Sequence, residues 1–334
     1  MSEILLSHGS GGSETHELIE DIILKKFGNP ILKSLGDSAL IEIEGSKLAF
    51  TTDSFVINPI FFKGGNIGKL AVCGTVNDLA VFGATPLYIS CSLIIEEGFS
   101  KKALLEILDS LAGEAKKAGV KVVTGDTKVV EKSSADKIFI NTSGIGLMNS
   151  QRSLSIAGIR RRDKILINGP IADHGISVLL AREEFGFKSG VKSDCACLNR
   201  LIAGVLKGCD TVKFMRDPTR GGVATTANEI TKGQRFGIRL YEDRIPLNLS
   251  TRAACELLGL DPLYIGNEGK VIMIVSEKEA AKAVRIMKRD PLGRKAAVIG
   301  EVTGDFQGRV VLKTRVGGDR IVDMLSKEAL PRIC

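Results

Sequence analysis

The sequence predicts a two-domain protein of the α/β or α+β class. Its 334 residues are enough for two cores of ordinary size. A content of 44% hydrophobic and 25% charged residues is typical of a globular chain. Helix and strand patterns alternate along the chain, which is the order expected of mixed α/β domains. Because no repeat of fixed period is visible, a solenoid is excluded.

Glycine-rich stretches and changes in pattern divide the chain into four parts. Residues 1–13 are expected to form a flexible glycine-rich segment, followed by an N-terminal domain over 14–150. A C-terminal α/β domain is expected over 151–316, after a linker at about 149–158. The last part, 317–334, is expected to be a mobile tail, because Gly317 and Gly318 follow the final strand pattern.

The first helix is predicted over 14–27, because Ser13 can cap its start and Gly28 can end it. Two amphipathic or small-residue patterns predict further helices in the first domain, at 67–82 and 100–118. Short apolar runs bounded by turn residues predict strands at 38–43, 47–52, 85–96, 120–124 and 137–148. The fourth of these strands is expected to end at the turn Gly125-Asp126-Thr127.

In the second domain, six apolar runs predict strands at 164–168, 211–215, 235–241, 270–275, 296–303 and 310–314. Helical patterns are found from Asp173 onward and at 195–207, 219–232, 251–259 and 277–288.

The composition also limits the classes of partner. The net charge of +7 invites a nucleic-acid hypothesis, but the basic residues are dispersed, Trp is absent and there are only three Tyr. A small anion or an acidic protein suits this charge better. Seven scattered cysteines and no signal peptide indicate a reducing cytoplasm. The longest uncharged run, 79–95, is broken by Gly83 and Pro86, so it does not predict a membrane span.

Four aspartates have small or apolar neighbours at the ends of core elements or within them: Asp37, Asp53, Asp78 and Asp126. Asp78 interrupts an apolar helix, where a buried carboxylate needs a metal or a cationic partner. Magnesium is commonly held by carboxylates together with phosphate oxygens. The four residues therefore favour a nucleotide site built around a metal, although each alone could be a turn or cap aspartate.

Three glycine-containing stretches were tested as phosphate loops. Residues 8–12 could cradle phosphate with backbone amides, or simply form a loose terminus. Residues 64–70 have the wrong spacing, and Leu70 replaces the hydroxyl that a phosphate loop requires. Residues 216–222 precede a helix, where exposed amides suit an anion and Asp217 could add a carboxylate.

Several single residues leave alternatives open. Glu268 is a candidate for proton transfer, although the local sequence favours a solvated turn glutamate. Cys334 is either a carrier thiol on a flexible arm or an incidental terminal cysteine. Cys195 and Cys197 lack a second cysteine pair, so packing on a helix is preferred over a metal site. His174 could cap a helix or contact an anion. Packing roles are expected for the other four cysteines, Cys73, Cys91, Cys209 and Cys255.

Residues 8–12, 51–55 and 68–88 together resemble the ATP-binding superfamily of aminoimidazole ribonucleotide synthetase and selenophosphate synthetase. Residues 216–222 and 267–269, and above all the terminus Pro331-Arg332-Ile333-Cys334, make the chain similar to the HypE family of hydrogenase maturation proteins within it. This resemblance implies a PurM-like fold, with the N-terminal domains of two subunits pairing into a β-barrel.

The resemblance also implies a reaction and its cofactors, ATP and Mg²⁺. A carbamoyltransferase partner, HypF, would load Cys334 with a carbamoyl group. ATP-dependent dehydration would turn this group into a thiocyanate, and its cyanide would pass to iron on a HypC–HypD scaffold. The implied catalytic residues are Cys334, Glu268 and Lys128. The implied metal ligands are Asp37, Asp53, Asp78, Asp126 and Asp217. The implied ATP-binding residues are His8, Gly9, Gly11, Gly12, Asp37, Asp53, Asn77, Asp78, Gly125, Asp126, Thr142 and Asp217.

Two other functions fit the same sequence. One is an ATP-dependent small-molecule synthetase or kinase in which Cys334 is incidental, and unchanged product formation without Cys334 would identify it. The other is a non-catalytic docking module of a maturation complex, which would not need to bury its core aspartates.

Overall fold

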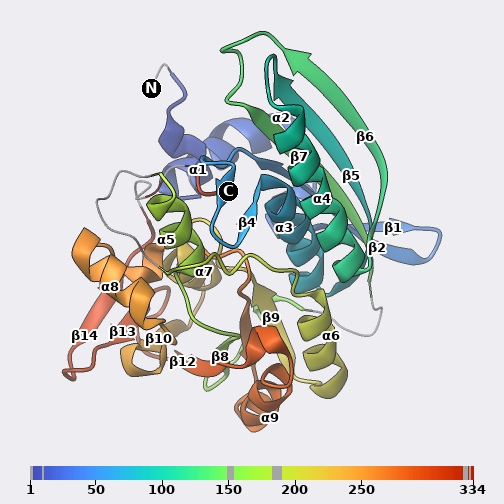
Figure 1. Ribbon diagram of the computed structural model, residues 1–334. Coiled ribbons are helices and arrows are strands. Elements are labelled where there is room, and N and C mark those ends of the chain that lie inside the picture. The colour runs from blue at the N-terminus through green and yellow to red at the C-terminus, as the bar shows by residue number, and fades with distance from the viewer. Residues whose placement is uncertain (1–2, 10, 149–153, 183–189, 326–329, 331) are drawn as a thin grey trace.

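Two sheets, each with its own helices, form the two halves of the molecule (Figure 1). The computed structural model describes residues 3–9, 11–148, 154–182, 190–325, 330 and 332–334. Within these residues no helix is long and apolar enough to cross a membrane. The C-terminus lies in the middle of the molecule, close to α3 and β4, so the end of the chain is not a projecting arm.

The first sheet has the order β1-β2-β7-β5-β6. Its strands are β1 (Ala39–Ile43), β2 (Ser46–Phe55), β7 (Ile138–Met148), β5 (Ala84–Glu96) and β6 (Lys121–Val130). All neighbours are antiparallel except β5 and β6, which are parallel because the helix α4 (Lys101–Ala118) connects them. The helices α3 (Ile67–Val81) and α4 lie over one face of this sheet (Figure 1).

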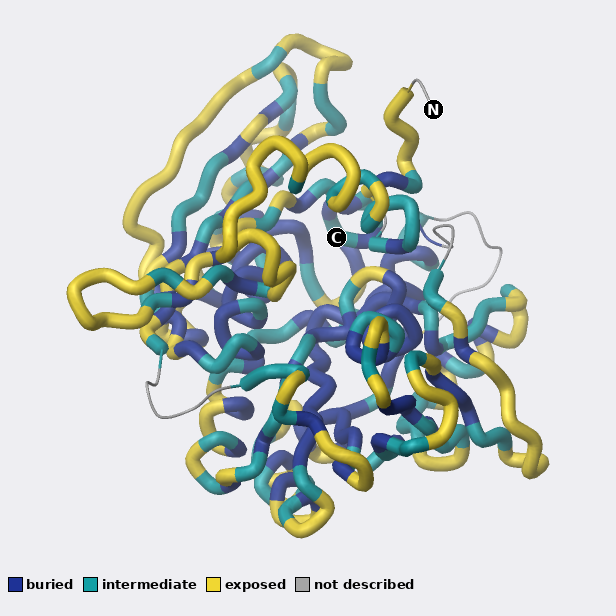
Figure 2. The backbone as a smooth tube through the Cα atoms, turned by 180° about the vertical axis from the view of Figure 1, so that it is seen from behind, coloured by how far each residue is buried: buried dark blue, intermediate teal, exposed yellow. Residues whose placement is uncertain are grey.

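The opposite face of the first sheet is open, and one end of it is apolar. Side chains alternate along a strand, and the buried residues Ile89 and Leu93 of β5 alternate with the exposed residues Tyr88 and Ile94. On the neighbouring strands, Phe50, Ile145 and Leu147 are also exposed. Figure 2 shows the edge strand β6 exposed along nearly its whole length.

The second sheet has the order β14-β13-β10-β12-β8-β11-β9. Its strands are β8 (Lys164–Ile167), β9 (Val212–Arg216), β10 (Gly237–Tyr241), β11 (Ile272–Val275), β12 (Ala297–Thr303), β13 (Val310–Lys313) and β14 (Asp319–Val322). The helices of this half are α5 (Asp173–Leu180), α6 (Asn199–Gly208), α7 (Gly222–Thr231), α8 (Leu249–Leu258) and α9 (Glu277–Met287). Its central strands are buried on both faces, as the unbroken apolar sequence of β11 requires.

Short elements complete the fold. The N-terminal helical segment runs through α1 (Ser13–Leu18), the π-helix η2 (Ile19–Ile23) and α2 (Leu24–Phe27), which together match the helix predicted over 14–27. A small hairpin, β3 (Phe61–Phe62) and β4 (Gly65–Asn66), precedes α3. The two halves share one hydrophobic cluster, in which Phe62 and Ile67 join Ile171 and Val178. The halves are therefore packed as one body around a common core.

Four predictions about elements are wrong. The strand predicted at 120–124 does not end at the Gly125-Asp126-Thr127 turn, because β6 continues to pair with β5 as far as Val130. The helix predicted from Cys195 begins only at Asn199. Asn77 Oδ1 accepts a hydrogen bond from the Leu198 amide, and this bond holds the preceding residues out of the helix. The hairpin of β3 and β4 was not predicted, since two-residue strands have no periodicity. The fourth is the prediction of a mobile tail from residue 317 onward, because Asp319–Val322 forms the strand β14 and pairs with β13.

At the other end of the chain, the segment expected to be flexible over 1–13 contains the 3-10 turn η1 (Leu6–Gly9). Arg220 donates a hydrogen bond from Nη1 to the Gly9 carbonyl at 2.6 Å, which ties this turn to the second half. Within the predicted linker and tail, residues 149–153, 326–329 and 331 lie outside the described residues.

The close contact between α3 and α4 gives a stability prediction. A Cβ on Gly68 would lie 2.2 Å from the Ile107 carbonyl oxygen, so alanine would force two helix backbones apart. We expect Gly68→Ala to lower the free energy of unfolding by about 1–3 kcal/mol, measured by urea denaturation. Gly113→Ala on α4 is the matched control: nothing lies within 4 Å of its Cβ position. It should raise stability by about 0.5–1 kcal/mol. Equal effects of the two variants would contradict this packing argument.

Candidate functional site

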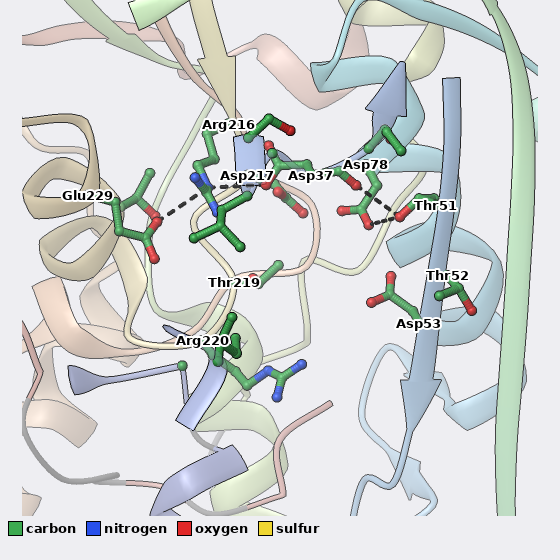
Figure 3. A pocket seen from close by; sticks show the side chains of 18 of the residues that line it. Asp37, Thr51, Thr52, Asp53, Asp78, Arg216, Asp217, Thr219, Arg220 and Glu229 are labelled. Atoms are coloured by element: carbon green, nitrogen blue, oxygen red, sulfur yellow. Dashed lines mark hydrogen bonds and ion pairs between the residues drawn. The ribbon is translucent and has the colours of Figure 1, made fainter. Parts of the chain in front are cut away.

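Four aspartates from distant parts of the chain line one cavity of about 420 Å³: Asp37, Asp53, Asp78 and Asp217. Asp53 lies on β2, where the alternation of side chains turns Thr51 and Asp53 toward α3 and leaves Thr52 outside. Asp78 is supplied by α3 itself, and Asp217 directly follows β9. Figure 3 shows these carboxylates facing one another across the cleft between the two halves.

Arg216 and a threonine hold two of the carboxylates in place. Arg216 Nε lies 3.1 Å from Asp37 Oδ1 and 3.3 Å from Glu229 Oε2, so a single guanidinium serves two acids. Thr51 Oγ1 lies 2.9 Å from both the Asp37 carbonyl oxygen and Asp78 Oδ2. These contacts fix side chains that would otherwise repel one another.

Burial raises the pKa of every carboxyl group in this cluster, and neighbouring carboxylates add to the shift at Asp37, Asp78 and Asp217. Loss of solvent raises the pKa of Asp37 to about 6, even though Arg216 opposes the shift. Burial, followed by the charge of Asp37, raises the pKa of Asp217 to about 8. The pKa of Asp78 is raised well above its usual range by burial and by Asp53, Asp217 and Asp37, and burial also raises that of Asp53.

The donor set suits a hard divalent cation. Carboxylate oxygens are the ligands that magnesium prefers, usually one or two of them together with substrate phosphates. The raised pKa values reflect the unfavourable free energy of ionising these four carboxyl groups inside the protein. A bound cation would offset this free energy, because it favours the ionised form of each group. The residues Asp37, Asp53, Asp78 and Asp217 therefore fit a magnesium site of the phosphate-binding kind.

The N-terminal segment forms another wall of the same cavity. Gly11, Thr15 and His16 line it, and Thr15 Oγ1 accepts a hydrogen bond from the Gly11 amide at 2.9 Å. A Cβ on Gly11, which has a φ of +81°, would lie 2.9 Å from Arg220 Cβ. Only glycine fits at this close approach without strain. Of the predicted residues 8–12, Gly11 reaches the cavity, His8 is buried beside it, and residue 10 lies outside the described residues.

The last three residues dock into the body like a short antiparallel strand. The Val56 amide donates to the Cys334 carbonyl at 3.2 Å, and the Asn58 amide donates to the Arg332 carbonyl at 3.1 Å. Arg332 returns a hydrogen bond from Nε to the Val56 carbonyl at 2.8 Å and pairs with Asp136 at 2.8 Å. Ile333 is buried. The terminus is thus held by specific contacts.

Docking brings Cys334 to a second cavity, of about 50 Å³, next to the carboxylates. Glu268, Ser54, Phe55 and Gly74 also line this small cavity. Five residues line both cavities: Asp53, Asp78, Asp217, Thr219 and Arg220. The terminal thiol and the acidic cleft therefore lie on two sides of one set of side chains.

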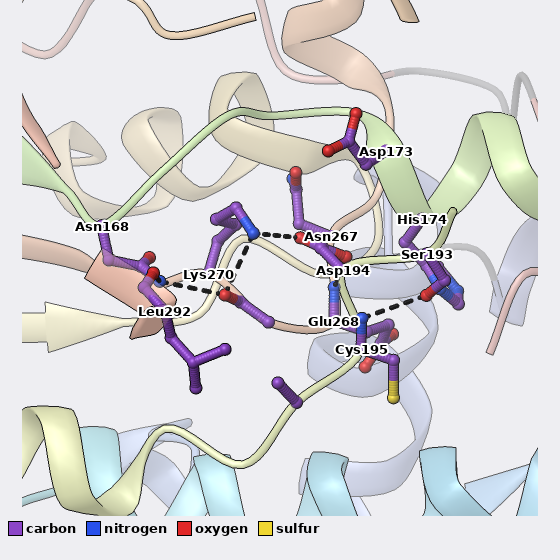
Figure 4. A network of polar contacts seen from close by, with 12 residues as sticks. Asn168, Asp173, His174, Ser193, Asp194, Cys195, Asn267, Glu268, Lys270 and Leu292 are labelled. Carbon is purple, nitrogen blue, oxygen red and sulfur yellow. Dashed lines mark hydrogen bonds and ion pairs between the residues drawn. The ribbon is translucent and has the colours of Figure 1, made fainter. Parts of the chain in front are cut away.

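Glu268 is buried at this junction, which corrects the expectation of a solvated turn residue. Its amide donates to Asp194 Oδ1 at 3.1 Å, and its carbonyl accepts from Asn77 Nδ2 at 3.3 Å (Figure 4). Burial, followed by Asp217, Asp194 and Asp53, raises the pKa of the Glu268 carboxyl well above its usual range. In its ionised form Glu268 is therefore a stronger base than an exposed glutamate.

His174 contacts the docked terminus. Burial lowers the pKa of its imidazole, so the ring is neutral. Its Nε2 lies 2.6 Å from the Ile333 carbonyl, which can only accept, so Nε2 carries the proton. Nδ1 then accepts from Ser193 Oγ at 2.8 Å (Figure 4). His174 therefore takes neither of its two predicted roles, helix cap or anion contact, and instead donates a hydrogen bond to the tail. Behind it, Lys270 and Asp194 form a buried ion pair at 2.7 Å.

Several predicted site residues lie elsewhere in this subunit. Across β5 and β7, Asp126 aligns with Ser54, the neighbour of Asp53, at a distance of three strand spacings or about 14 Å. Asp126 is exposed and pairs with Lys128 at 2.9 Å. Gly125 lies beside it on β6. These three residues do not reach the acidic cluster within one chain.

Two other predicted nucleotide ligands are structural. The amide group of Asn77 is buried, bonded to the Ala196 and Glu268 carbonyls and to the Leu198 amide. The buried Thr142 hydroxyl lies 2.5 Å from Thr75 Oγ1 and donates to the Ala71 carbonyl at 3.2 Å. Both side chains are satisfied inside the protein and line neither cavity.

Sequence reasoning missed Thr51, Arg220 and Glu229 as site residues. Thr51 lies two positions before Asp53 on a strand, so the alternation of β2 was a usable signal. Arg220 lies within the anion-binding stretch 216–222, but its side chain was not singled out. Glu229 gives no local signal, because its role depends on the fold bringing α7 beside Arg216.

Comparison with known protein families identifies the domain type of each half of the chain. Residues 35–148 match the N-terminal domain, and residues 161–313 the C-terminal domain, of AIR synthase related protein. Carbamoyl dehydratase HypE from Bradyrhizobium diazoefficiens is 46% identical over 330 residues, covering 98% of this chain and 95% of that protein.

Solved structures give the same result. A HypE–HypF complex contains a chain with a TM-score of 0.87 and 46% identity, covering 92% of this chain and 99% of that one. A HypE structure in complex with ATP has a TM-score of 0.83 and 44% identity, covering 99% of this chain and all of that one.

The raised carboxyl pKa values predict a pH-dependent stability. A carboxyl group whose pKa is higher in the folded than in the unfolded state stabilises the fold at low pH, and this contribution is lost as pH rises through the folded pKa. Asp217, with a pKa of about 8 against 3.8, should therefore lower stability steadily up to about pH 8. We expect Asp217→Asn to remove at most about 2 kcal/mol of the fall between about pH 6 and about pH 8.

Urea denaturation at several pH values, without divalent cations, measures this slope. Asp126→Asn is the control, because this aspartate is exposed and its pKa is lowered by Lys128. Its slope should equal that of the unchanged protein. If Asp217→Asn also leaves the slope unchanged, the assignment of a raised pKa to Asp217 is wrong.

Proposed function

The chain belongs to the AIR synthase related family and, within it, to the carbamoyl dehydratases of the HypE type, and on this premise we propose that it dehydrates a carbamoyl group carried on its own Cys334. The reaction consumes ATP and converts the S-carbamoyl group into a thiocyanate. The thiocyanate is the source of cyanide for the metal centre of a [NiFe]-hydrogenase.

One observation carries this proposal above the others. The sulfur-bearing terminus docks in a cavity that shares Asp53, Asp78 and Asp217 with the larger acidic cleft. A nucleotide in the cleft and a carbamoyl group on Cys334 would therefore meet at the same carboxylates. A synthetase or kinase acting on a separate small molecule has no need to seat its own C-terminus there.

The chemistry explains the need for ATP. Amide oxygen is a poor leaving group, and transfer of the γ-phosphoryl group to that oxygen converts it into phosphate, which leaves readily. The C–O bond then breaks, and the carbon–nitrogen bond becomes triple as nitrogen loses both of its protons. The atoms balance: S-carbamoyl cysteine and ATP give S-cyanocysteine, ADP, hydrogen phosphate and one released proton, with the amide oxygen ending in the phosphate.

The residues of the chain divide this work. Glu268, buried beside Cys334, takes a proton from nitrogen, and its raised pKa makes it an effective acceptor. His174 and Arg332 hold the terminus so that the carbamoyl group stays oriented. Gly11 and the neighbouring N-terminal turn close over the phosphates. Asp37, Asp53, Asp78 and Asp217 would hold magnesium, which supplies positive charge beside the phosphates.

A second subunit accounts for the predicted residues that lie outside the cluster. Phe50, Tyr88 and Ile145 are neighbours on adjoining strands, so they form one continuous apolar patch and not three isolated exposed residues. The sheet continues from this patch to the exposed edge strand β6. Pairing of two such sheets would form the barrel expected of the family. It would also bring Asp126 and Lys128 of one subunit toward a site in the other.

The partners follow from the reaction. A HypE–HypF complex is known among the relatives, and HypF is the donor that we propose for the carbamoyl group. A HypC–HypD complex would accept the cyanide. Both transfers require the terminus to leave its docked position. All seven cysteines are free thiols, which suits a reducing compartment such as the cytoplasm.

Intact-mass spectrometry tests the proposed reaction. After incubation with HypF, carbamoyl phosphate and ATP, Cys334 should carry a carbamoyl adduct that then loses the mass of one water. Glu268→Gln should keep the adduct and lose the dehydration, because the buried amide cannot accept the proton. Replacing ATP in the dehydration step by a non-hydrolysable analogue should stop it in the same way. An adduct that forms in Cys334→Ser, or dehydration that ignores ATP, would overturn the proposal.

The proposed dimer is tested by its sheet face. Ile145→Lys places a charge between Phe50 and Tyr88, its neighbours on the two adjoining strands. We expect a shift from dimer to monomer in light scattering, because an ammonium group cannot be buried in an apolar interface. Leu257→Lys is the control, since Leu257 is 72% exposed on α8, away from this sheet. A dimer that survives Ile145→Lys would contradict this interface.

A further inference from the structure

A second cluster of reactive side chains lies outside the catalytic cleft. Cys73 is buried in α3, Glu114 lies on α4, and Cys197 lies in the extended segment that precedes α6. The Cys197 thiol donates to Cys73 Sγ at 3.5 Å. One donor atom from each of the three residues lies within 4.8 Å of the other two.

No sequence pattern links these three residues. Cys73 and Cys197 are 124 positions apart, and both were expected to serve only in packing. The prediction that Cys195 and Cys197 lie on a helix is wrong, because both precede α6 in an irregular segment that is hydrogen-bonded to α3 through Asn77. The Cys195 thiol is a further neighbour of Cys73. Two thiols and a carboxylate from three separate parts of the chain therefore converge, with a third thiol nearby.

We propose that Cys73, Cys197 and Glu114 bind a thiophilic divalent cation of the zinc class, with Cys195 supplying a further sulfur beside Cys73. Two thiolates bound to one tetrahedral zinc, each at about 2.3 Å, lie about 3.8 Å apart. The observed separation of 3.5 Å differs from this by only a few tenths of an ångström. Carboxylate oxygen is also a common zinc ligand. Binding releases thiol protons and needs no oxidant or reductant.

The surroundings of the cluster support a metal site. Lys117 Nζ lies 2.9 Å from Glu114 Oε1, the kind of outer contact that orients a ligating carboxylate. Glu114 and Lys117 also line a surface groove along α4, together with Lys69 and Gly113. An ion can therefore reach the carboxylate from solvent, while the sulfurs lie deeper.

The position of the cluster gives the ion a structural role. Asn77, one turn along α3 from Cys73, bonds the Ala196 carbonyl and the Leu198 amide, and it also bonds the Glu268 carbonyl. The segment that contains Cys197 thus lies between the metal ligands and the residue proposed to move protons. A bound ion would fasten this segment to α3 and α4 and stabilise the fold by mass action.

Cadmium and cobalt are suitable probes, because their thiolate complexes absorb light through sulfur-to-metal charge transfer. The full-length protein is reduced, treated with a chelator, and titrated with Cd²⁺ and then Co²⁺. The titrations are made in a Cys334→Ser background, because Cys334 is another thiol beside carboxylates. With Mg²⁺ in excess to fill the carboxylate cleft, we expect the charge-transfer band of a thiolate complex to saturate at one equivalent of metal, together with a raised Tm.

Two variants and two matched controls locate the ion. Cys197→Ser and Glu114→Gln should weaken binding by about 10-fold to 100-fold or more. Cys255→Ser, elsewhere in the second half, and Glu106→Gln, on α4 but outside the cluster, should bind as before. Because Glu114→Gln keeps the size and shape of the side chain, it should fold even if a cysteine variant does not. Circular dichroism checks this.

Three results would overturn the proposal. They are the absence of a charge-transfer band in the Cys334→Ser background, equal binding by Glu114→Gln and Glu106→Gln, and a Cys73–Cys197 disulfide that persists in reductant and excludes metal. The test uses neither ATP nor a carbamoyl donor. Its failure would therefore leave the proposed reaction untouched, and failure of the Cys334 mass experiment would leave this site untouched.

Discussion

The structure depends on one electrostatic constraint: four carboxylates are brought together, largely out of water, with too little positive charge to balance them. Arg216 pairs with Asp37 but is shared with Glu229, and Asp78 receives a hydrogen bond from the Thr51 hydroxyl. Ionised carboxylates buried in this way cost several kcal/mol. The raised pKa values record that cost. A fold that keeps such an arrangement is organised to receive a cation and the phosphates that accompany it.

Much of this arrangement was readable in the sequence, because burial of a charged residue is visible as a break in an apolar pattern. Asp53 and Asp78 were found in this way. The same signal failed for Asp126, whose apolar neighbours on β6 face an open sheet and not a core. It also failed for Glu268, where the local sequence indicates a turn. Only packing between the two halves buries that residue.

The elements themselves were largely predictable, and the errors share one cause. Helix and strand periods are local, so α3, α4 and most strands of both sheets were found close to their observed bounds. The errors lie where a distant residue decides. Asn77 delays the start of α6, β5 extends β6, and β13 recruits residues 319–322 as a strand. Tertiary hydrogen bonds of this kind leave no trace in a single segment.

The docked terminus follows from the same constraint. Its carbonyls are held by two backbone amides and His174, and Arg332 pairs with Asp136. Each hydrogen bond contributes only about 1 kcal/mol net, and the ion pair is partly exposed. Together these contacts contribute enough free energy to hold Cys334 in its docked position, and little enough that the terminus can be released again. Phosphoryl transfer and proton removal both take place at the carboxylates that the two cavities share, so the arm has to be docked for these two steps. It can leave for every step that needs another protein.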